Sequence, residues 1–262
     1  MGAGVTLLPL SATAQRGDPV AIGKGGRGRG VREGGWSVFR GIRYGADMTR
    51  RRFQAPVALP LARDILLATA FGPSCPQRGG SDLTQAKDCW FLDIWTPDAR
   101  AGANHPVIFP QRRRFGRTVI EPLVFGQHWA PRDVVVATVN HRLNALGYLY
   151  FDRLATRFAD SGNAGQPDLI LALQWARDNI TGFDGNADRM MVFGQSGGDA
   201  KIATLMAMPA ARGLCHSTAT MSERQATASG PINATGRLQA CLARRASARE
   251  CDPADSGQYA CN

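Results

Sequence analysis

Continuous apolar runs along the chain predict a buried sheet. Residues 134–139 read Val-Val-Val-Ala-Thr-Val, and residues 190–193 read Met-Met-Val-Phe. Strands without polar alternation are typical of a parallel sheet covered by helices on both faces. Between these runs, residues 169–179 place apolar side chains at helical spacing, and Asp168 is positioned to cap the start of that helix. The order strand, helix, strand indicates the α/β class.

The N-terminal half of the chain shows a different pattern. From residue 30 to residue 44, glycines alternate with hydrophobic residues, which predicts paired antiparallel strands. Residues 91–95, followed by Pro97, are predicted to form a further strand. Because no internal repeat and no linker divides the chain, we expect one α/β unit. It should have N-terminal antiparallel strands and a partial central, mostly parallel sheet flanked by helices.

A serine bracketed by glycines follows the last apolar run. Residues 194–198 read Gly-Gln-Ser-Gly-Gly, the G-x-S-x-G spacing. A nucleophilic serine needs a sharp strand-to-helix turn that holds its Oγ clear of the backbone, and the flanking glycines leave room for that bend. Residues 200–208 are compatible with the following helix and end before Pro209. The pattern predicts Ser196 as a nucleophile.

Composition and charge narrow the functional classes. The chain has 262 residues, of which 44% are hydrophobic, and this suits a globular core. No apolar run reaches the roughly 18 residues that a membrane-spanning helix requires. The net charge of +10 comes mostly from arginine, and residues 26–30 resemble an RGG segment. No aromatic residues interleave with those arginines, so we interpret them as a basic, solvated surface and expect no nucleic-acid partner.

Two interpretations of the N-terminus stay open. Residues 5–14 resemble the end of a secretory signal, with an A-x-A cleavage site after Ala14, but they lack a basic n-region. Residues 1–19 are therefore either a signal remnant or a disordered start. The first interpretation implies a secreted or periplasmic protein, and the second leaves it cytoplasmic.

Short motifs spread over the chain carry a family resemblance. In chain order they are residues 39–44 (FRGIRY), 52–56 (RFQAP), 71–77 (FGPSCPQ), 88–97 (DCWFLDIWTP), 139–148 (VNHRLNALGY), 162–168 (GNAGQPD) and 172–175 (ALQW). With the serine turn that follows, they resemble the N-terminal part of the type-B carboxylesterase family of α/β-hydrolases, which includes cholinesterase-like enzymes. The resemblance implies a truncated α/β-hydrolase fold.

The resemblance also implies an ester hydrolase that works through an acyl-enzyme. Ser196 would attack the carbonyl carbon of a small-molecule carboxylic ester, and the backbone N–H of Gly197 would be one oxyanion donor. Neither a cofactor nor a metal is implied. The remaining positions of the expected elbow are Gly194, Gln195 and Gly198.

The six cysteines fit no zinc pattern, because none lies in a C-x₂-C pair. Cys75 and Cys89 flank a short polar loop that a disulfide would close in an exported protein, and they match the first disulfide of the family. The other cysteines show no interpretable spacing: Cys215, Cys241, Cys251 and Cys261.

The expected oxyanion loop departs from the family pattern. The family supplies further donors from a His-Gly-Gly-Gly loop, whereas residues 110–115 here read Pro-Gln-Arg-Arg-Arg-Phe. Glycines let bare backbone approach the substrate oxygen, while arginines add bulk and charge. One hypothesis for Arg112–Arg114 is a local reading-frame slip, because glycine codons read one base out of frame encode arginine.

No catalytic histidine or acid is identified in the chain. In the family both lie well beyond the elbow, in a C-terminal half that has no counterpart here. His105, His128, His141 and His216 are each interpreted as surface or structural residues. Asp199, one turn into the elbow helix, is interpreted as stabilising the helix N-terminus rather than as catalytic.

The tail also departs from the family. Residues 237–245 are compatible with a helix, but the tail as a whole, residues 236–262, is without clear periodicity. Strands beyond the elbow strand are expected to be absent, which would leave its outer edge unpaired. The predicted organisation is thus a start at 1–19, a partial α/β-hydrolase domain at 20–235 and the divergent tail.

Two functional hypotheses stay open. The first is a carboxylic-ester hydrolase impaired by the missing triad members and the altered oxyanion loop. The second is a catalytically inactive, truncated remnant of such an enzyme. Because triad members act as a unit, we expect negligible turnover from the serine alone. A third hypothesis, a nucleic-acid-binding module, rests on charge only and is not favoured.

Overall fold

The structure is a computed structural model. It describes residues 17–60, 65–77, 84–99, 102–111, 133–154, 156–222, 233–236 and 238–240. Several sequence predictions lie outside the described residues: the signal-like segment, Arg112–Arg114, His128, Cys241, Cys251 and Cys261.

Within the described residues, the larger sheet contains seven strands. They are β3 (Val31–Glu33), β4 (Trp36–Arg43), β6 (Phe91–Thr96), β7 (His105–Gln111), β8 (Val135–Val139), β9 (Gly185–Gly194) and β10 (Ser217–Thr220). Across the sheet they lie in the order β10-β9-β7-β8-β6-β4-β3. The neighbouring strands β10, β9, β7 and β8 run parallel to one another. Strands β6, β4 and β3 pair antiparallel with their neighbours. The predicted α/β arrangement is confirmed.

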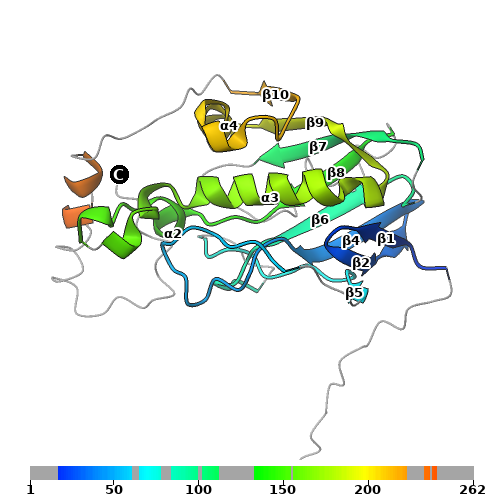
Figure 1. Cartoon of the computed structure of the whole chain (residues 1–262), viewed down its shortest axis with the longest axis horizontal. Helices are drawn as coiled ribbons and strands as arrows, with labels where there is room; N and C mark the ends of the chain where they lie inside the picture. Colours follow the sequence, from blue (N-terminus) through cyan, green and yellow to red (C-terminus); the bar gives the residue numbers. More distant parts are fainter. Residues whose placement is uncertain are drawn as a thin grey trace, which may run out of the picture.

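A smaller sheet packs beside the large one (Figure 1). In the described part of the chain it consists of β1 (Val20–Gly23), β2 (Gly26–Arg29) and β5 (Ile65–Leu67), with β2 in the middle. Among the described residues, the α-helices include α2 (Asn144–Tyr148), α3 (Gly165–Asn179) and α4 (Gly197–Ala207), and residues 233–236 and 238–240 are helical as well. Short 3₁₀ turns are η3 (Asp152–Leu154), η4 (Thr156–Phe158), η5 (Ser161–Asn163), η6 (Ile180–Phe183) and η7 (Pro209–Ala211). No described helix has the length and apolar character needed to cross a membrane.

Burial on both faces of β8 explains its unbroken apolar sequence. All five of its residues are buried. Val135 and Ala137 belong to the main core, to which α3 contributes Leu169 and Leu173. Val136 points to the opposite face, where it clusters with Val38 and Trp95. In Figure 1, α3 crosses the face of the sheet that is turned to the viewer.

The prediction that Asp168 caps the start of the central helix is wrong. Helix α3 begins at Gly165, with Ala164 as the N-cap residue and no side-chain cap bond. Asp168 therefore lies inside the first turn, where it is fully buried. Its carboxylate binds Arg142 instead of the helix terminus, because a buried guanidinium needs a charged partner.

The expectation of an unpaired edge beside the elbow strand is also wrong. Strand β10 pairs parallel with β9, from Ser217 opposite Met191 to Thr220 opposite Gly194. The sequence of β10 is Ser-Thr-Ala-Thr, which is mostly exposed and lacks the apolar run of the other parallel strands. Since a polar edge strand has no hydrophobic signature, the pairing was not visible in the sequence pattern.

A buried carboxyl group in β6 makes the stability of the fold depend on pH. Burial raises the pKa of Asp93 to about 7, against the lowering effects of the Gly41 N–H, the charge of Arg40 and the Thr138 hydroxyl. The folded state thus holds this proton up to near neutrality, whereas an unfolded chain releases it near pH ~4. The folded state binds more protons between these limits, so its stability falls as pH rises through them.

We expect Asp93→Asn to remove this dependence. Asparagine keeps an oxygen that accepts the Gly41 N–H bond, which is 2.8 Å long to Asp93 Oδ1, but it has no proton to lose. In urea unfolding between about pH 5 and pH 7, wild type should lose on the order of 1 kcal/mol per pH unit relative to the variant. Parallel pH profiles for the two proteins would contradict the assignment.

Candidate active site

The serine predicted as nucleophile lies at a sharp turn between β9 and α4. Ser196 has φ 57° and ψ −115°, and α4 begins at the next residue, Gly197. A non-glycine residue with positive φ is sterically unfavourable and is found where the surrounding structure enforces it. The side chain is half-buried. Strand, strained serine and helix therefore have the geometry that the G-x-S-x-G spacing predicted.

Gly194 is required by the close approach of the helix to the strand. A Cβ at this position would lie 2.6 Å from the carbonyl carbon of Gly198 and 2.9 Å from the Asp199 nitrogen. These are backbone atoms, which cannot rotate away. The glycine two residues before Ser196 thus allows α4 to start directly against the end of β9.

Hydrogen bonds fix the turn from both sides. The Gly198 N–H donates to the Gln195 carbonyl at 3.0 Å, and the Asp199 N–H donates to the Ser196 carbonyl at 3.0 Å. The Met221 N–H, just beyond β10, donates to the Gly194 carbonyl at 3.0 Å. The exposed Gln195 side chain donates from Nε2 to Ser222 Oγ at 3.2 Å. The last two bonds hold the segment that follows β10 against the elbow.

The residue predicted as an oxyanion donor lies at the start of α4. Gly197 is the first residue of α4, and the first N–H groups of a helix have no partner within the helix. The other expected donors fall in residues 112–115, outside the described residues. Strand β7 ends at Gln111, which lies directly opposite Gly194. The buried Gln111 Nε2 has no hydrogen-bond partner among the described residues, a feature that sequence reasoning did not single out.

No described histidine contacts Ser196. His105 begins β7, at the end of the sheet away from the elbow, and its Nε2 lies 3.7 Å from Asp184 Oδ2. His216 is exposed and donates its backbone N–H to Met190, four residues before the end of β9. At about 3.3 Å per residue, that level is roughly 13 Å from Gly194. These positions agree with the interpretation of His105 and His216 as surface or structural residues.

His141 lies at the same edge of the sheet as the elbow, because it follows β8, which runs parallel to β7. Its side chain is buried, and no described residue is a hydrogen-bond partner of Nε2. Burial and the positive charges of Lys201 and Arg142 hold the pKa of His141 well below its usual range. The imidazole is therefore neutral at pH ~7, which suits a structural residue.

Asp199 is more buried than its position suggested. The sequence placed it at the start of the elbow helix, where a carboxylate is normally exposed, but the side chain is fully buried. Oδ1 accepts the Met221 N–H at 3.2 Å, and within the part of the chain that the structure describes Oδ2 has no hydrogen-bond partner. Lys201, two residues further along α4, is buried as well. The local sequence did not predict that either side chain would be buried.

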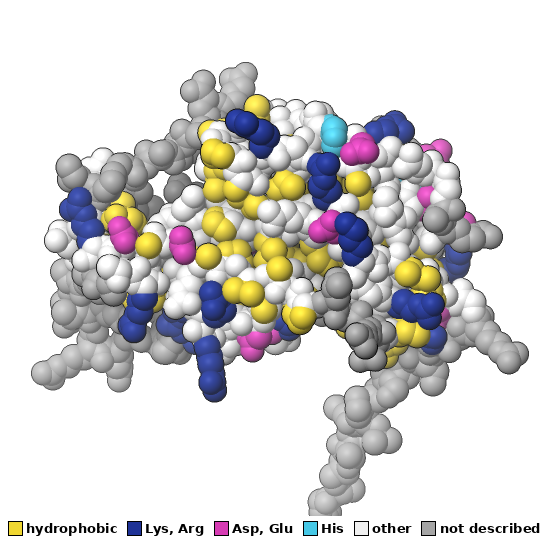
Figure 2. Space-filling model, in the orientation of Figure 1, with side chains coloured by type: hydrophobic (Ala, Val, Ile, Leu, Met, Phe, Trp, Pro, Cys, Tyr) yellow, Lys and Arg dark blue, Asp and Glu magenta, His cyan; other side chains and the backbone are white. Residues whose placement is uncertain are grey.

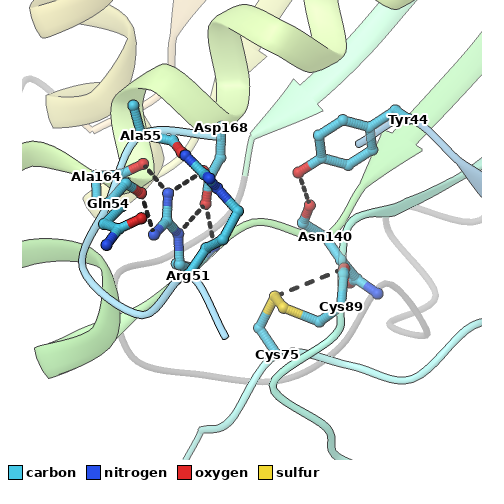
Figure 3. Close-up of polar contacts among 10 residues, drawn as sticks. Tyr44, Arg51, Gln54, Ala55, Cys75, Cys89, Asn140, Ala164 and Asp168 are labelled. Atoms are coloured by element: carbon cyan, nitrogen blue, oxygen red, sulfur yellow. Dashed lines mark hydrogen bonds and ion pairs between the residues drawn. A yellow bond between two sulfur atoms is a disulfide. The ribbon is translucent and has the colours of Figure 1, made fainter. Parts of the chain in front are cut away.

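A fully buried ion pair joins three segments of the fold. Arg142 donates from Nε and Nη2 to the two carboxylate oxygens of Asp168, at 2.9 and 2.6 Å, and its backbone N–H adds a bond of 2.9 Å. The remaining guanidinium donors bind the carbonyls of Gln54 and Ala164. In Figure 3, Asp168, Gln54 and Ala164 lie close together. The pair joins the segment after β8 to α3 and to the loop at residue 54.

Cys75 and Cys89 form a disulfide, as predicted, with Cα atoms 5.0 Å apart (Figure 3). Nearby, Tyr44 donates its hydroxyl to the Asn140 carbonyl at 2.6 Å. Cys215 is a free, half-buried thiol, and burial raises its pKa. Among the described residues, no group of three His, Cys, Asp or Glu side chains lies together as a metal site would require.

Comparison with known proteins identifies the family of this chain. Residues 20–261 match the profile of the carboxylesterase family. The chain belongs to the carboxylesterase family. Its fold agrees, since a carboxylesterase of Geobacillus stearothermophilus superposes with a TM-score of 0.81 at 29% identity, over 90% of this chain and 51% of the other.

Curated carboxylesterases show the same relationship. The para-nitrobenzyl esterase of Bacillus subtilis is 35% identical over 201 residues, which cover 72% of this chain and 40% of that protein. The fumonisin B1 esterase of Sphingopyxis macrogoltabida is 30% identical over 247 residues, 85% of this chain and 45% of that protein. The chain thus spans about half the length of these relatives.

Proposed function

We propose that Ser196 is the nucleophile of a carboxylic-ester hydrolase. The observation that carries the proposal is the φ of 57° at Ser196, between the end of β9 and the start of α4. Backbone strain of this kind costs on the order of 1–3 kcal/mol and persists where the surrounding structure enforces it, commonly at active sites. Membership of the carboxylesterase family supports ester hydrolysis as the reaction class.

The reaction proceeds by acyl transfer. Ser196 Oγ bonds to the carbonyl carbon of a small-molecule ester while its proton passes to a base, and the backbone N–H of Gly197 donates to the developing oxyanion. Collapse of this intermediate releases the alcohol and leaves the acyl group on Ser196. Water then attacks the acyl ester, which releases the carboxylic acid and restores the serine.

A second candidate is a catalytically inactive carboxylesterase-family protein. It is favoured by the absence of any histidine hydrogen-bonded to Ser196 within the residues that the structure describes. The arginines at 112–114, in place of glycines, point the same way. Loss of triad members costs roughly 10⁴–10⁶ in kcat in a well-studied serine hydrolase, so turnover by the serine alone would be very slow.

Covalent labelling separates the two candidates. The full chain is treated with a fluorophosphonate probe and, separately, with a para-nitrophenyl ester, beside Ser196→Ala. A matched control is Ser217→Ala, which changes an exposed serine of β10. If Ser196 is the nucleophile, wild type and Ser217→Ala should take up the probe and release para-nitrophenol, while Ser196→Ala does neither. Neither labelling nor turnover in wild type would support the inactive candidate, and equal labelling of wild type and Ser196→Ala would show that Ser196 is not the nucleophile.

The disulfide supports a proposal about the cellular compartment of the protein. Cys75–Cys89 bonds of this kind persist in oxidising compartments, so we propose an exported protein, in line with the signal-like residues 5–14. Fractionation of cells that make the full chain tests this, and recovery only in the cytosol would contradict it.

A further inference from the structure

The small sheet presents two rows of side chains on one side. Val20 lies opposite Arg29, and Arg29 lies opposite Leu67, while Ile22, Arg27 and Ile65 align in the same way. Directly paired residues project to the same side of a sheet, and so do residues two apart on one strand. Each row therefore places an arginine on the central strand between two aliphatic side chains.

Burial shows that this side faces solvent. Ile22 is 59% exposed and Leu67 is 64% exposed, and Val20 and Ile65 are also exposed. Arg27 is exposed as well, whereas Arg29 is half-buried and its Nε is buried. On the other side, Ala21 is 1% exposed and belongs to the main core. We call the six side chains, Val20, Ile22, Arg27, Arg29, Ile65 and Leu67, the arginine–aliphatic face.

The positive charge of this face is not neutralised by the described residues. Within the described residues, neither Arg27 nor Arg29 forms an ion pair. By contrast, Arg43 is paired with Asp88 at 2.6 Å, and Arg40 is paired with Glu33. The chain as a whole carries a net charge of +10. Figure 2 shows hydrophobic and basic side chains together over the small sheet, at the right of the view.

We propose that the arginine–aliphatic face binds an anionic lipid surface. Guanidinium groups pair with phosphate head groups while flanking aliphatic side chains enter the boundary between head groups and acyl chains. The six side chains include no aromatic ring, which single-stranded nucleic acids use for stacking. A two-fold contact with a second copy would bring the arginines of the central strand face to face, so like charges oppose that occupant.

Vesicle flotation with the full chain tests the proposal. Vesicles of phosphatidylglycerol mixed with phosphatidylcholine should carry the protein upward, and pure phosphatidylcholine vesicles should not. Arg27→Gln/Arg29→Gln should weaken binding about 30-fold, since a basic residue near an anionic membrane contributes about 1 kcal/mol. Ile22→Ser/Leu67→Ser should weaken it as well, and salt near 1 M, where the Debye length is ~3 Å, should release the protein.

The matched control is Arg157→Gln/Arg189→Gln, which removes the same charge from exposed arginines elsewhere. It should float nearly as wild type does. Circular dichroism checks the fold of each variant, and the single variant Arg27→Gln replaces the double one if that unfolds. Equal losses in the face and control variants would overturn the proposal. So would equal binding to neutral vesicles, face variants that affect only oligonucleotide binding, or face variants that affect only self-association in sedimentation.

Discussion

Replacing Asp168 with alanine is expected to lower the free energy of unfolding by about 3–5 kcal/mol. Both Arg142 and Asp168 are fully buried, with side-chain exposures of 0%. Without the carboxylate, the guanidinium stays buried with its charge uncompensated, because its other bonds go to the carbonyls of Gln54 and Ala164. Since domains of this kind are stable by only about 5–15 kcal/mol, the loss would be a large fraction of the total.

Chemical denaturation followed by far-UV circular dichroism measures this effect. The matched control is Asp178→Ala, which breaks the exposed pair between Asp178 and Lys24, whose side chains are 56% and 73% exposed. Exposed pairs contribute about 0–1 kcal/mol, so the control should unfold nearly as wild type does. The double variant Arg142→Met/Asp168→Leu should recover part of the loss, since it leaves no buried charge. Similar midpoints for Asp168→Ala and Asp178→Ala would show that the pair has no such role.

Gly194→Ala is expected to abolish the reactivity of Ser196 and to destabilise the fold. The new methyl group would lie 2.6 Å from the Gly198 carbonyl carbon, so the start of α4 must move away from β9. A displacement of about 1 Å at a reacting group costs about 100-fold in rate. Overpacking against backbone typically adds about 1–3 kcal/mol of destabilisation.

Fluorophosphonate labelling and denaturant unfolding report the two effects separately. Gly236→Ala is the matched control, because a Cβ there meets nothing within 4 Å. That variant should label at the wild-type rate and unfold at a similar or slightly higher denaturant concentration. If Gly194→Ala labels at the wild-type rate while remaining folded, the elbow does not position Ser196 and the proposed nucleophile is wrong.

The sequence alone determined the elements whose geometry is local. The runs at 134–139 and 190–193 predicted strands that became β8 and part of β9, because burial on both faces selects an unbroken apolar stretch. The glycines around Ser196 predicted the sharp turn, since the bend needs space at fixed positions in the chain. The spacing of the motifs likewise identified the family that the comparisons show.

Only the tertiary structure decided the contacts between distant segments. Asp168 was expected to cap its own helix, yet it pairs with Arg142, 26 residues earlier in the chain. Strand β10 covers the edge of β9 although its sequence has no apolar run. The burial of Asp199 and the arginine–aliphatic face depend on packing and on strand register in the same way. Periodicity reports how one segment divides its own side chains between core and solvent, whereas pairing depends on which distant segment the fold brings alongside.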